Sequence, residues 1–474
     1  MSAVTDQAPT RAHQAAVEEL RRAYQSIPPG VPVRLAKRTS NLFRFREPGP
    51  APGGGLDAEP FSKVLSVDPQ ARTAVAGGMT TYEDLVDATL PHGLMPLVVP
   101  ELKTITLGGA VTGLGVESTS LRNGLPHESV LAMEILTGDG RVVTATAGNE
   151  HAALHRGFPN SYGTLGYALS LTIELEPVQP FVHLRHFRFG AAAACMDAIG
   201  EIAASGGYQG HRADFTDGTV FGPDEMYLTV GAFTDRAPWR SDYTGRHIYY
   251  KSIRGPREDF LTIRDYLWRW DTDWFWCSRP FGVQHPLVRA MWPKRYRRSD
   301  TYRKLVAFDR ARGLSSALDR RLGRPAREMV IQDVEIPLGG TAEFLRFFGD
   351  SVGMSPVWLC PLRLRSAQSW PLYPLRPGEM YVNVGFWGTA PLPDGQADGY
   401  HNRRIEEKVA GLGGHKGLYS TSFYSEDEFW EHYNGSAYAE LKRAYDGDGR
   451  LAGLYEKCVQ GKPQAAGQAR AAGR

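Results

Sequence analysis

The sequence is poor in cysteine, holds no long apolar run and has no excess of charge of one sign. Its four cysteines, Cys195, Cys277, Cys360 and Cys458, lie far apart without a C-x-x-C pair, so neither a disulfide framework nor a thiolate metal site is indicated. No stretch offers about 18 consecutive apolar residues, and the N-terminus lacks the basic start and apolar core of a leader. We therefore expect a cytoplasmic protein without a membrane-spanning helix.

The charge balance and the length of the chain limit the classes of protein to which it can belong. The 474 residues include 54 Lys and Arg against 52 Asp and Glu, a balance that gives no global reason to expect a nucleic-acid partner. The length favours two domains with short extensions. We predict an N-terminal helical extension over residues 1–28, a first domain over 29–180, a second domain over 181–460 and a flexible tail over 461–474.

The first 180 residues mix helix and strand patterns. Residues 17–27 carry apolar side chains at helical spacing, and Thr80 with Glu83 predicts a capping box for a helix that ends at Gly93. Residues 138–140, Gly-Asp-Gly, predict a hairpin turn, and residues 167–176 alternate between apolar and polar side chains as a half-buried strand does. The pattern is typical of an α+β domain.

A glycine-rich segment runs from Thr106 to Gly124. Glycines among small and hydroxylated residues let backbone amides approach an anionic or planar ligand without interference from side chains. A pyrophosphate group is the obvious guest. On composition alone, a glycine-rich structural turn is an equal alternative.

The motifs around this segment resemble those of a known family of flavoproteins. In order they are Val-Val-Pro-Glu-Leu at 98–102, the glycine-rich segment, an apolar strand at 133–137 and Gly-Thr-Leu-Gly at 163–166. This order is similar to the FAD domain of the vanillyl-alcohol oxidase and p-cresol methylhydroxylase superfamily. The motif Gly-Val-Glu-Ser-Thr-Ser at 115–120 resembles the delta-24 sterol reductase branch, as do motifs at 356–361, 380–384 and 428–436.

The resemblance implies a fold and a cofactor site. The fold would be α+β, with a two-subdomain p-cresol methylhydroxylase-type FAD-binding domain followed by an α+β substrate or cap domain with an antiparallel sheet. No His or Cys stands at the family's usual covalent attachment points and Glu117 replaces the common His, which implies non-covalent FAD. The implied FAD contacts are Thr106, Gly108, Gly109, Gly113, Gly115, Ser118, Ser120 and Gly124, then Gly163, Thr164 and Gly166, and, in a first phosphate loop that lacks the usual glycines, Lys37, Arg38, Thr39, Ser40 and Asn41.

The resemblance also implies reduction of an isolated carbon–carbon double bond in a lipid, with NADPH reducing the FAD. An unactivated branched alkene accepts hydride poorly, but protonating its less substituted carbon places a tertiary cation where hydride can be delivered. Such a site needs an acid, a dry pocket and good alignment. Candidates for the acid or its relay are Glu117, Tyr381 with Asn383, and His415 with Lys416, each with a purely structural alternative; Asp333 and Glu335 are weaker candidates.

The substrate is the open question at this level. The leading hypothesis is the methylene branch of a phospholipid-bound 10-methylene fatty acyl chain, which would become the 10-methyl branch of a tuberculostearic-type lipid. A partner methyltransferase would then supply the substrate. The alternatives are delta-24 sterol reductase activity, an FAD-dependent oxidase of an alcohol, sugar or lactone, and a flavin- or lipid-binding protein without catalysis.

Tryptophans gather in one part of the second domain. Five of the ten, Trp268, Trp270, Trp274, Trp276 and Trp292, precede or adjoin a basic stretch at 294–304. Aromatic rings beside cations suit a membrane interface, while a core-forming cluster beside a solvated face is an equal alternative. A lipid substrate favours the first, so we expect peripheral contact with the inner face of the cell membrane through residues 268–276 and 294–304.

Two other patterns carry no function. His151 and His155 lie four residues apart, but no third ligand is near, so we expect no metal site. The glycines of residues 411–417 imitate a dinucleotide fingerprint, yet they follow a helical pattern instead of a strand, which predicts a helix end and loop.

Overall fold

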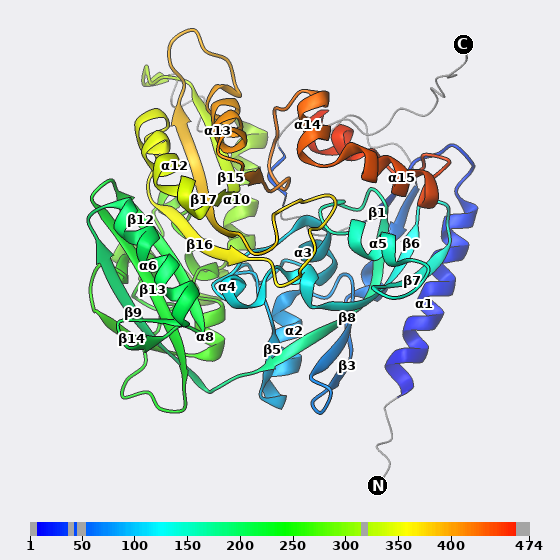
Figure 1. Ribbon diagram of the computed structural model, residues 1–474, viewed down its shortest axis with the longest axis horizontal. Helices are drawn as coiled ribbons and strands as arrows, with labels where there is room; N and C mark the ends of the chain where they lie inside the picture. Colours follow the sequence, from blue (N-terminus) through cyan, green and yellow to red (C-terminus); the bar gives the residue numbers. More distant parts are fainter. Residues whose placement is uncertain (1–6, 37–41, 45–53, 314–320, 461–474) are drawn as a thin grey trace.

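The computed structural model describes residues 7–36, 42–44, 54–313 and 321–460. Two β-sheets organise the chain, one in each of two lobes, and Figure 1 shows helix α3 (Leu107–Gly113) near the middle of the molecule between them. The pairs of strands within both sheets are antiparallel in the described residues. Antiparallel sheets with helices on one face are α+β architecture, which confirms the predicted fold class.

The first lobe is built on a six-stranded sheet. Its strand order is β3-β4-β8-β6-β7, with β5 paired to β8. The predicted alternation at 167–176 is confirmed, because Leu169, Leu171, Ile173 and Leu175 of β8 are all buried. The elements are β3 (Val64–Asp68), β4 (Thr73–Gly77), α2 (Tyr82–Thr89), β5 (Leu94–Pro96), α3, α4 (Ser120–Asn123), β6 (Val130–Thr137), β7 (Val142–Thr146), α5 (Ala152–Gly157) and β8 (Gly166–Pro177).

The turns and caps of this lobe test the local sequence signals. The Gly-Asp-Gly hairpin joins β6 to β7 as predicted. The capping box assigned to Thr80 and Glu83 is wrong by one residue. The Thr81 hydroxyl accepts from the Asp84 amide at 3.1 Å and donates to its carboxylate at 2.6 Å, whereas Thr80 is buried beneath the helix start.

The second lobe carries an eight-stranded sheet. Its order is β14-β9-β13-β12-β16-β17-β15-β18. Helices α6, α12 and α13 pack on it through a separate apolar core. Its elements are β9 (Phe181–Phe189), α6 (Ala192–Ser205), β12 (Phe215–Gly222), β13 (Glu225–Thr234), β14 (Glu258–Thr262), β15 (Arg327–Pro337), α12 (Leu338–Ser351), β16 (Val357–Arg363), β17 (Met380–Pro391), α13 (Tyr400–Gly411) and β18 (His415–Lys416).

The ends of the described chain both belong to the first lobe. Helix α1 (Gln7–Ser26) buries Val17, Leu20 and Tyr24 in a core that also includes residues of β6 and β8. Helix α14 (Glu426–His432) leads from the second lobe into α15 (Gly435–Tyr445), which packs against α5 (Figure 1). Residues 442–457 also donate or accept hydrogen bonds with the first lobe, although the sequence analysis grouped them with the second.

The segment between β14 and β15 holds the tryptophan cluster. Trp268, Trp270, Trp274 and Trp276 are all buried, at 1 to 6% exposure. The expected membrane contact through residues 268–276 is therefore wrong, because rings packed in the core cannot reach lipid headgroups. Among the described residues, no helix combines the length and apolar character needed to cross a membrane.

The ends of two later helices are clearly defined. A capping box of Ser425 and Glu428 begins α14, with both reciprocal hydrogen bonds present. The glycines of 411–417 lie at the C-terminal end of α13, where Gly413 adopts a positive φ of 71°. That conformation is typical of a helix C-cap. The predicted flexible tail at 461–474 lies outside the described residues.

Candidate active site

A cleft of about 1350 Å³, including its open mouth, lies between the two lobes. One side is formed by α3 and the loops that flank it in the first lobe. The opposite side is formed by β15, β17 and the aromatic segment of the second lobe. Residues of both lobes therefore surround one cavity, and ligand sites are common at such interfaces between parts of a fold.

Glycines of the predicted FAD loop form one edge of the cleft. Gly109, Gly113 and Gly115 all line it, as does Thr106, whose hydroxyl accepts from the Gly109 amide at 3.2 Å and caps α3. A Cβ at Gly109 would lie 2.8 Å from the Thr106 hydroxyl oxygen, and one at Gly115 would lie 3.1 Å from Pro126. The backbone is thus exposed to a ligand where side chains would not fit, so these residues fit a pyrophosphate-bearing cofactor such as FAD.

Other residues of the same loop lie behind this edge. Gly108 packs against Gly78, whose carbonyl oxygen would be 2.7 Å from a Cβ at Gly108. The Ser118 hydroxyl donates to the Glu117 carboxylate at 2.6 Å, and Ser120 accepts from the Glu117 amide at 3.0 Å. Gly124 ends α4 with a φ of 72°. The structure gives Gly108, Ser118, Ser120 and Gly124 roles in shaping the loop and does not place them on the cleft wall.

The second glycine motif sits beside the cleft. Tyr162 lines the cleft and its hydroxyl donates to the Gly113 carbonyl at 2.7 Å. Gly163 and Gly166 have positive φ angles of 74° and 151°, which let the chain turn away after Tyr162, while Thr164 is buried. Gly163, Thr164 and Gly166 therefore position Tyr162 and do not line the cleft themselves. The predicted contacts Lys37, Arg38, Thr39, Ser40 and Asn41 lie outside the described residues.

Aromatic side chains form the wall that faces the glycine edge. Phe275 stacks on Trp387 with ring centroids 4.2 Å apart, and Trp274 stacks on Phe43 at 5.6 Å. Trp274 and Phe275 have positive φ angles of 47° and 59°, which are uncommon for bulky residues. Trp358 completes this wall. The tryptophan cluster thus reaches the cleft through Trp274, in a dry and apolar part of it.

A carboxyl group that the sequence analysis did not select lies in the cleft. Glu101 lines it but is only 6% exposed, and its Oε1 has no hydrogen-bond partner among the described residues. Burial, and then the neighbouring carboxyl of Glu117, raise the pKa of Glu101 well above its usual range. The environment of Glu101 therefore favours the protonated form of its carboxyl group. The sequence signal that could have identified Glu101 is an acidic residue flanked by apolar residues in the motif at 98–102.

Glu117 serves a different purpose from the one expected. Its carboxylate accepts from Arg269 at 3.1 Å, and Arg269 also donates to Asp217 at 2.7 Å; all three side chains are buried. The Arg269 guanidinium lies 4.0 Å from the centroid of the Tyr266 ring. Glu117 does not line the cleft. It belongs to a buried ion network behind Glu101, and it acts on the cleft through that neighbour.

Asp333 and Glu335, the weaker candidates, prove to be central. They lie two residues apart on β15, so their side chains share one face of the strand, and both line the cleft. Burial raises the pKa of Asp333 to about 6 and that of Glu335 to about 8. Tyr373 donates a hydrogen bond to the Glu335 carboxylate. Glu335 is accordingly a carboxylic acid that is mostly protonated at neutral pH.

The remaining predicted residues stand one layer back from the cleft. The Asn383 amide donates to Asp333 at 2.9 Å, so Asn383 supports a residue of the cleft. The Tyr381 hydroxyl donates to Glu379 at 3.0 Å, on the side away from the cleft. The direct catalytic role expected for these two residues has no geometric basis, because neither side chain lines the cleft.

His415 and Lys416 are also displaced from the cleft. Lys416 is fully buried, with its Nζ 2.5 Å from the Glu406 carboxylate. His415 pairs with Glu335 in the sheet, and burial lowers its pKa to about 4. A neutral imidazole and an ion-paired ammonium are poor acids for substrate. Both residues instead brace the strand that carries Glu335.

Comparisons with known proteins agree with this geometry. Residues 12–146 match the model of the FAD binding domain family. The chain is 26% identical over 447 residues to the Delta(24)-sterol reductase of Arabidopsis thaliana, covering 86% of this chain and 77% of that protein. It is 27% identical over 419 residues to the human Delta(24)-sterol reductase, covering 85% and 75%. A rice cytokinin dehydrogenase 2 matches 41% of this chain at 26% identity and 32% of its own length.

The fold, the glycine edge and the family match define an FAD-binding oxidoreductase of the p-cresol methylhydroxylase type. Within that class, the protein is a flavin-binding reductase related to the Delta(24)-sterol reductases, a relationship that extends over most of the chain. The resemblance drawn from the motifs is thereby confirmed.

Proposed function

We propose that the protein is an NADPH-using reductase of an isolated carbon–carbon double bond in a lipid. Its preferred substrate in this proposal is the methylene branch of a phospholipid-bound 10-methylene fatty acyl chain. The observation that carries the proposal is that one cleft holds an aromatic wall and two buried carboxyl groups, Glu101 and Glu335, whose pKa values are raised by burial. Protonation of an unactivated alkene requires that combination of an acid and a dry site.

The residues of the cleft have separable roles in this reaction. When bound, FAD would supply the hydride equivalent. Glu101 or Glu335 donates the proton to the less substituted carbon, and each then holds a negative charge that its surroundings must tolerate. Tyr373 can stabilise that charge at Glu335 by its hydrogen bond, and Asn383 holds the neighbouring Asp333 in place. Trp274, Trp387 and their neighbours exclude water, which would otherwise trap a carbocation.

The cofactor is expected to be held without a covalent bond. Among the described residues that line the cleft there is neither His nor Cys, the side chains that the family uses for attachment. The Glu117 carboxylate is engaged by Arg269 and Ser118 behind the cleft wall. Acid precipitation of the purified protein should therefore release all the flavin into the supernatant. Flavin that stayed with the pellet would contradict this expectation.

A second candidate substrate is a sterol with a side-chain double bond. The names of the relatives that match over most of the chain favour it. A Δ24 alkene and a methylene branch both give a tertiary cation when protonated, so the same acid and the same aromatic wall serve either substrate. The difference lies in which molecule fills the apolar part of the cleft.

Two measurements test the reaction and the substrate. Anaerobic mixing with NADPH should bleach the flavin absorbance promptly, and bleaching only by an alcohol would identify an oxidase and refute the reductase. Mass spectrometry of lipids from cells with and without the gene should show methylene-branched acyl chains accumulating upon deletion. An unchanged acyl profile, with reduction of a Δ24 sterol by the purified protein, would establish the second candidate instead.

A methyltransferase partner follows from the preferred substrate alone. The 10-methylene group must be installed on the acyl chain before it can be reduced. We propose that the enzyme that installs it works alongside this reductase. Co-purification of a methyltransferase from the native cell would support the pairing, and methylene-branched lipid formed and reduced equally well by the two enzymes in separate compartments would oppose it.

A further inference from the structure

Exposed apolar side chains concentrate on one part of the second lobe. Helix α9 (Pro286–Met291) and the turn η6 (Lys294–Tyr296) carry four of them, Leu287, Val288, Met291 and Tyr296, which we call the α9 surface. Leu287 is 72% exposed and Met291 is 85% exposed. These two residues are four apart on the helix, so they share one side of it. Large apolar residues gathered in this way mark interaction sites.

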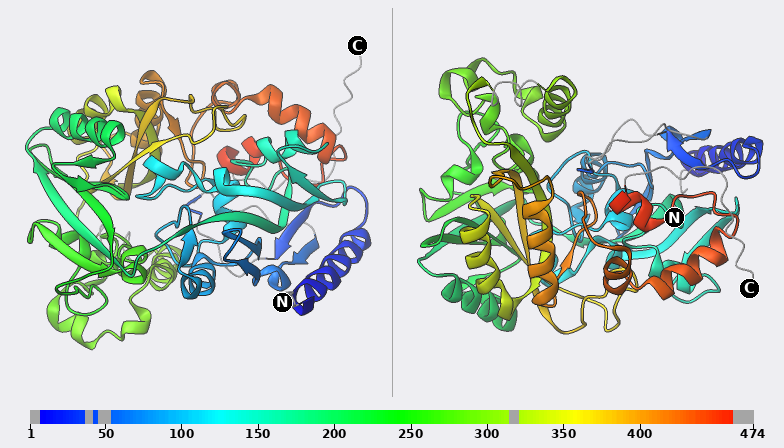
Figure 2. Two further views of the ribbon diagram at one scale, coloured as in Figure 1. Left: turned by 60° about the horizontal axis from the view of Figure 1, so that its bottom comes forward. Right: turned by 90° about the horizontal axis from the view of Figure 1, so that it is seen from above.

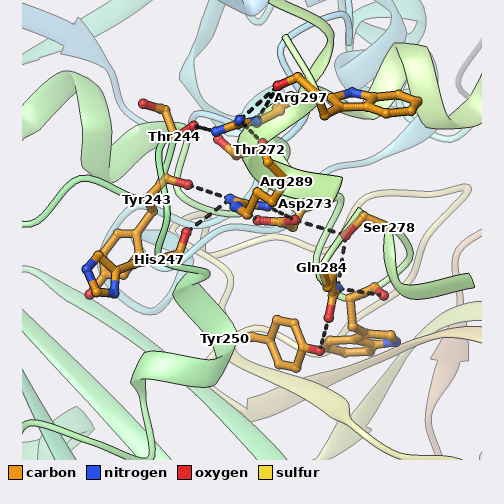
Figure 3. A network of polar contacts seen from close by, with 12 residues as sticks. Tyr243, Thr244, His247, Tyr250, Thr272, Asp273, Ser278, Gln284, Arg289 and Arg297 are labelled. Carbon is orange, nitrogen blue, oxygen red and sulfur yellow. Dashed lines mark hydrogen bonds and ion pairs between the residues drawn. The ribbon is translucent and has the colours of Figure 1, made fainter. Parts of the chain in front are cut away.

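The opposite side of α9 is fixed to the body of the lobe. Arg289 is 2% exposed and donates to both carboxylate oxygens of Asp273, at 2.7 and 3.0 Å, and to the carbonyls of Tyr243 and His247 at 3.0 Å. Arg297 donates to the carbonyl of Thr244 at 2.6 Å (Figure 3). A buried arginine with this many partners holds a short helix in one orientation. The α9 surface is therefore presented rigidly to the outside.

The region around the α9 surface is strongly basic. Residues 279–312 contain ten Lys or Arg against two Asp, whereas the whole chain is nearly balanced at 54 against 52, although two of the ten, Arg289 and Arg297, are buried. Lys294 and Arg295, directly after α9, are exposed, and Lys294 lies 3.6 Å from Asp242. Helix α10 (Ser299–Arg312) adds Lys304, which is 80% exposed. The charge is thus local to this part of the surface.

The region also projects from the protein and is joined to the cleft. Both views of Figure 2 show α9 and α10, in light green, standing out from the body. The Ser299 hydroxyl of α10 donates to Asp271 at 2.6 Å, and the Tyr302 hydroxyl donates to the carbonyl of Thr272. Trp274 of the cleft wall follows two residues later. Helix α10 is therefore anchored on the segment that carries Trp274.

We propose that the α9 surface docks the protein on an anionic phospholipid bilayer. Leu287, Val288 and Met291 enter the boundary between headgroups and acyl chains, and Lys294 and Arg295 meet lipid phosphates. Amphipathic surfaces bind membranes by this sum of apolar burial and attraction to anionic lipid. A nucleic acid would satisfy the cations but leave Leu287 and Met291 in water. The membrane site is thus displaced from the buried tryptophans to the helix that follows them.

Co-sedimentation of the FAD-loaded protein with vesicles tests this proposal without relying on turnover. One set of vesicles is phosphatidylcholine alone and the other contains about 30% phosphatidylglycerol. We expect at least tenfold tighter binding to the anionic set, weakened by salt. Leu287→Glu with Met291→Glu, and separately Lys294→Glu with Arg295→Glu, should each reduce binding roughly tenfold or more. Leu131→Glu is the matched control, because Leu131 is 46% exposed on β6 of the other lobe.

Several outcomes would overturn the proposal. Equal binding to both sets of vesicles, no binding to either, or binding unchanged by both double substitutions would each refute docking through the α9 surface. Light scattering provides a further check. A dimer of the free protein that dissociates in the Leu287→Glu and Met291→Glu variant would assign the surface to a second copy of the chain. Flavin reduction by NADPH, which does not involve the α9 surface, distinguishes these failures from a failure of the proposed reaction.

Discussion

Arg269 donates to Asp217 at 2.7 Å while both side chains are buried, and the same guanidinium donates to Glu117 at 3.1 Å. One cation therefore offsets two carboxylates behind the cleft wall. Trp270 and Trp358 donate to the same Asp217 oxygen from their indole nitrogens, at 3.1 and 3.4 Å. Through Trp358 the network reaches the cleft itself.

Removing this cation should unfold or severely destabilise the protein. Arg269→Met leaves two buried carboxylates without a compensating positive charge, which costs about 3–5 kcal/mol. Adding Asp217→Asn should recover part of that loss, since one uncompensated charge disappears. Arg264→Met is the control, because Arg264 is half exposed in its pair with Asp87 and such pairs contribute under about 1 kcal/mol. Urea unfolding checks all three, and equal losses in the Arg269 and Arg264 variants would contradict the network's importance.

The proton donor can be identified by substituting Glu101 and Glu335, the two buried carboxyls with raised pKa values, separately. Glu101→Gln or Glu335→Gln should lower kcat by about 10²–10⁴, the usual contribution of general acid catalysis, while the bound flavin stays reducible by NADPH. The variant with the larger loss marks the donor. Glu343→Gln, at an exposed site on α12, should leave kcat unchanged. Full activity in both cleft variants would exclude both residues as the donor.

The pH dependence of turnover follows from the same acids. A general acid must be protonated to act, and the pKa of Glu335 is raised to about 8 by burial. If Glu335 is the donor, kcat should therefore be level near pH 7 and fall as the pH rises through about 8. In Glu335→Gln the fall near pH 8 should disappear from any residual rate. A rate that instead rises through pH 8 would indicate a base.

Stability should also depend on Glu335 between about pH 4.5 and 8. Its folded pKa lies above the unfolded value of about 4.5, so the stability present below pH 4.5 is lost as the pH rises through about 8. From pH 5 to pH 9 the wild type should lose up to about 4 kcal/mol more than Glu335→Gln, since one pKa unit is worth about 1.4 kcal/mol. Thermal unfolding of both proteins with saturating FAD measures this difference. Parallel pH curves would show that Glu335 is already ionised in the fold.

A side chain at the glycine edge should interfere with the cofactor. Gly109→Val places a Cβ 2.8 Å from the Thr106 hydroxyl oxygen and further atoms at the edge of the cleft. We expect FAD affinity to fall at least tenfold, with secondary structure by circular dichroism unchanged. Gly349→Val is the control, because Gly349 lies in α12 and a Cβ there would meet no described atom within 4 Å beyond its own helix. Normal flavin content in the Gly109 variant would contradict the placement of the cofactor at this edge.

Local patterns in the sequence predicted local structure well. The alternation of Leu169, Leu171 and Ile173 determines a half-buried strand because period two is a property of the strand alone. The Gly-Asp-Gly hairpin between β6 and β7 is likewise a short-range feature. The glycines of the cleft could be predicted because they lie in short motifs that can be recognised from consecutive residues.

Long-range packing was not accessible in the same way. The tryptophan segment follows neither helical nor strand periodicity, and Trp274 and Phe275 turn through positive φ angles, so no pattern indicated which rings would be buried. Glu101 and Glu335 are more than 200 residues apart, and only the closure of the two lobes brings them to one cleft. Their raised pKa values are products of that closure.

The first lobe is closed by the last part of the described chain. The Val33 amide donates to the Arg450 carbonyl at 2.8 Å, Lys442 donates to the Thr164 carbonyl at 2.8 Å, and Lys457 donates to the Tyr162 carbonyl at 2.6 Å. Ribosomes release chains from the N-terminus, and domains commonly fold in that order during synthesis. Here the flavin-binding lobe cannot be completed until residue 457 has emerged, long after its own sheet has been made. We therefore expect cofactor loading to follow translation of nearly the entire polypeptide.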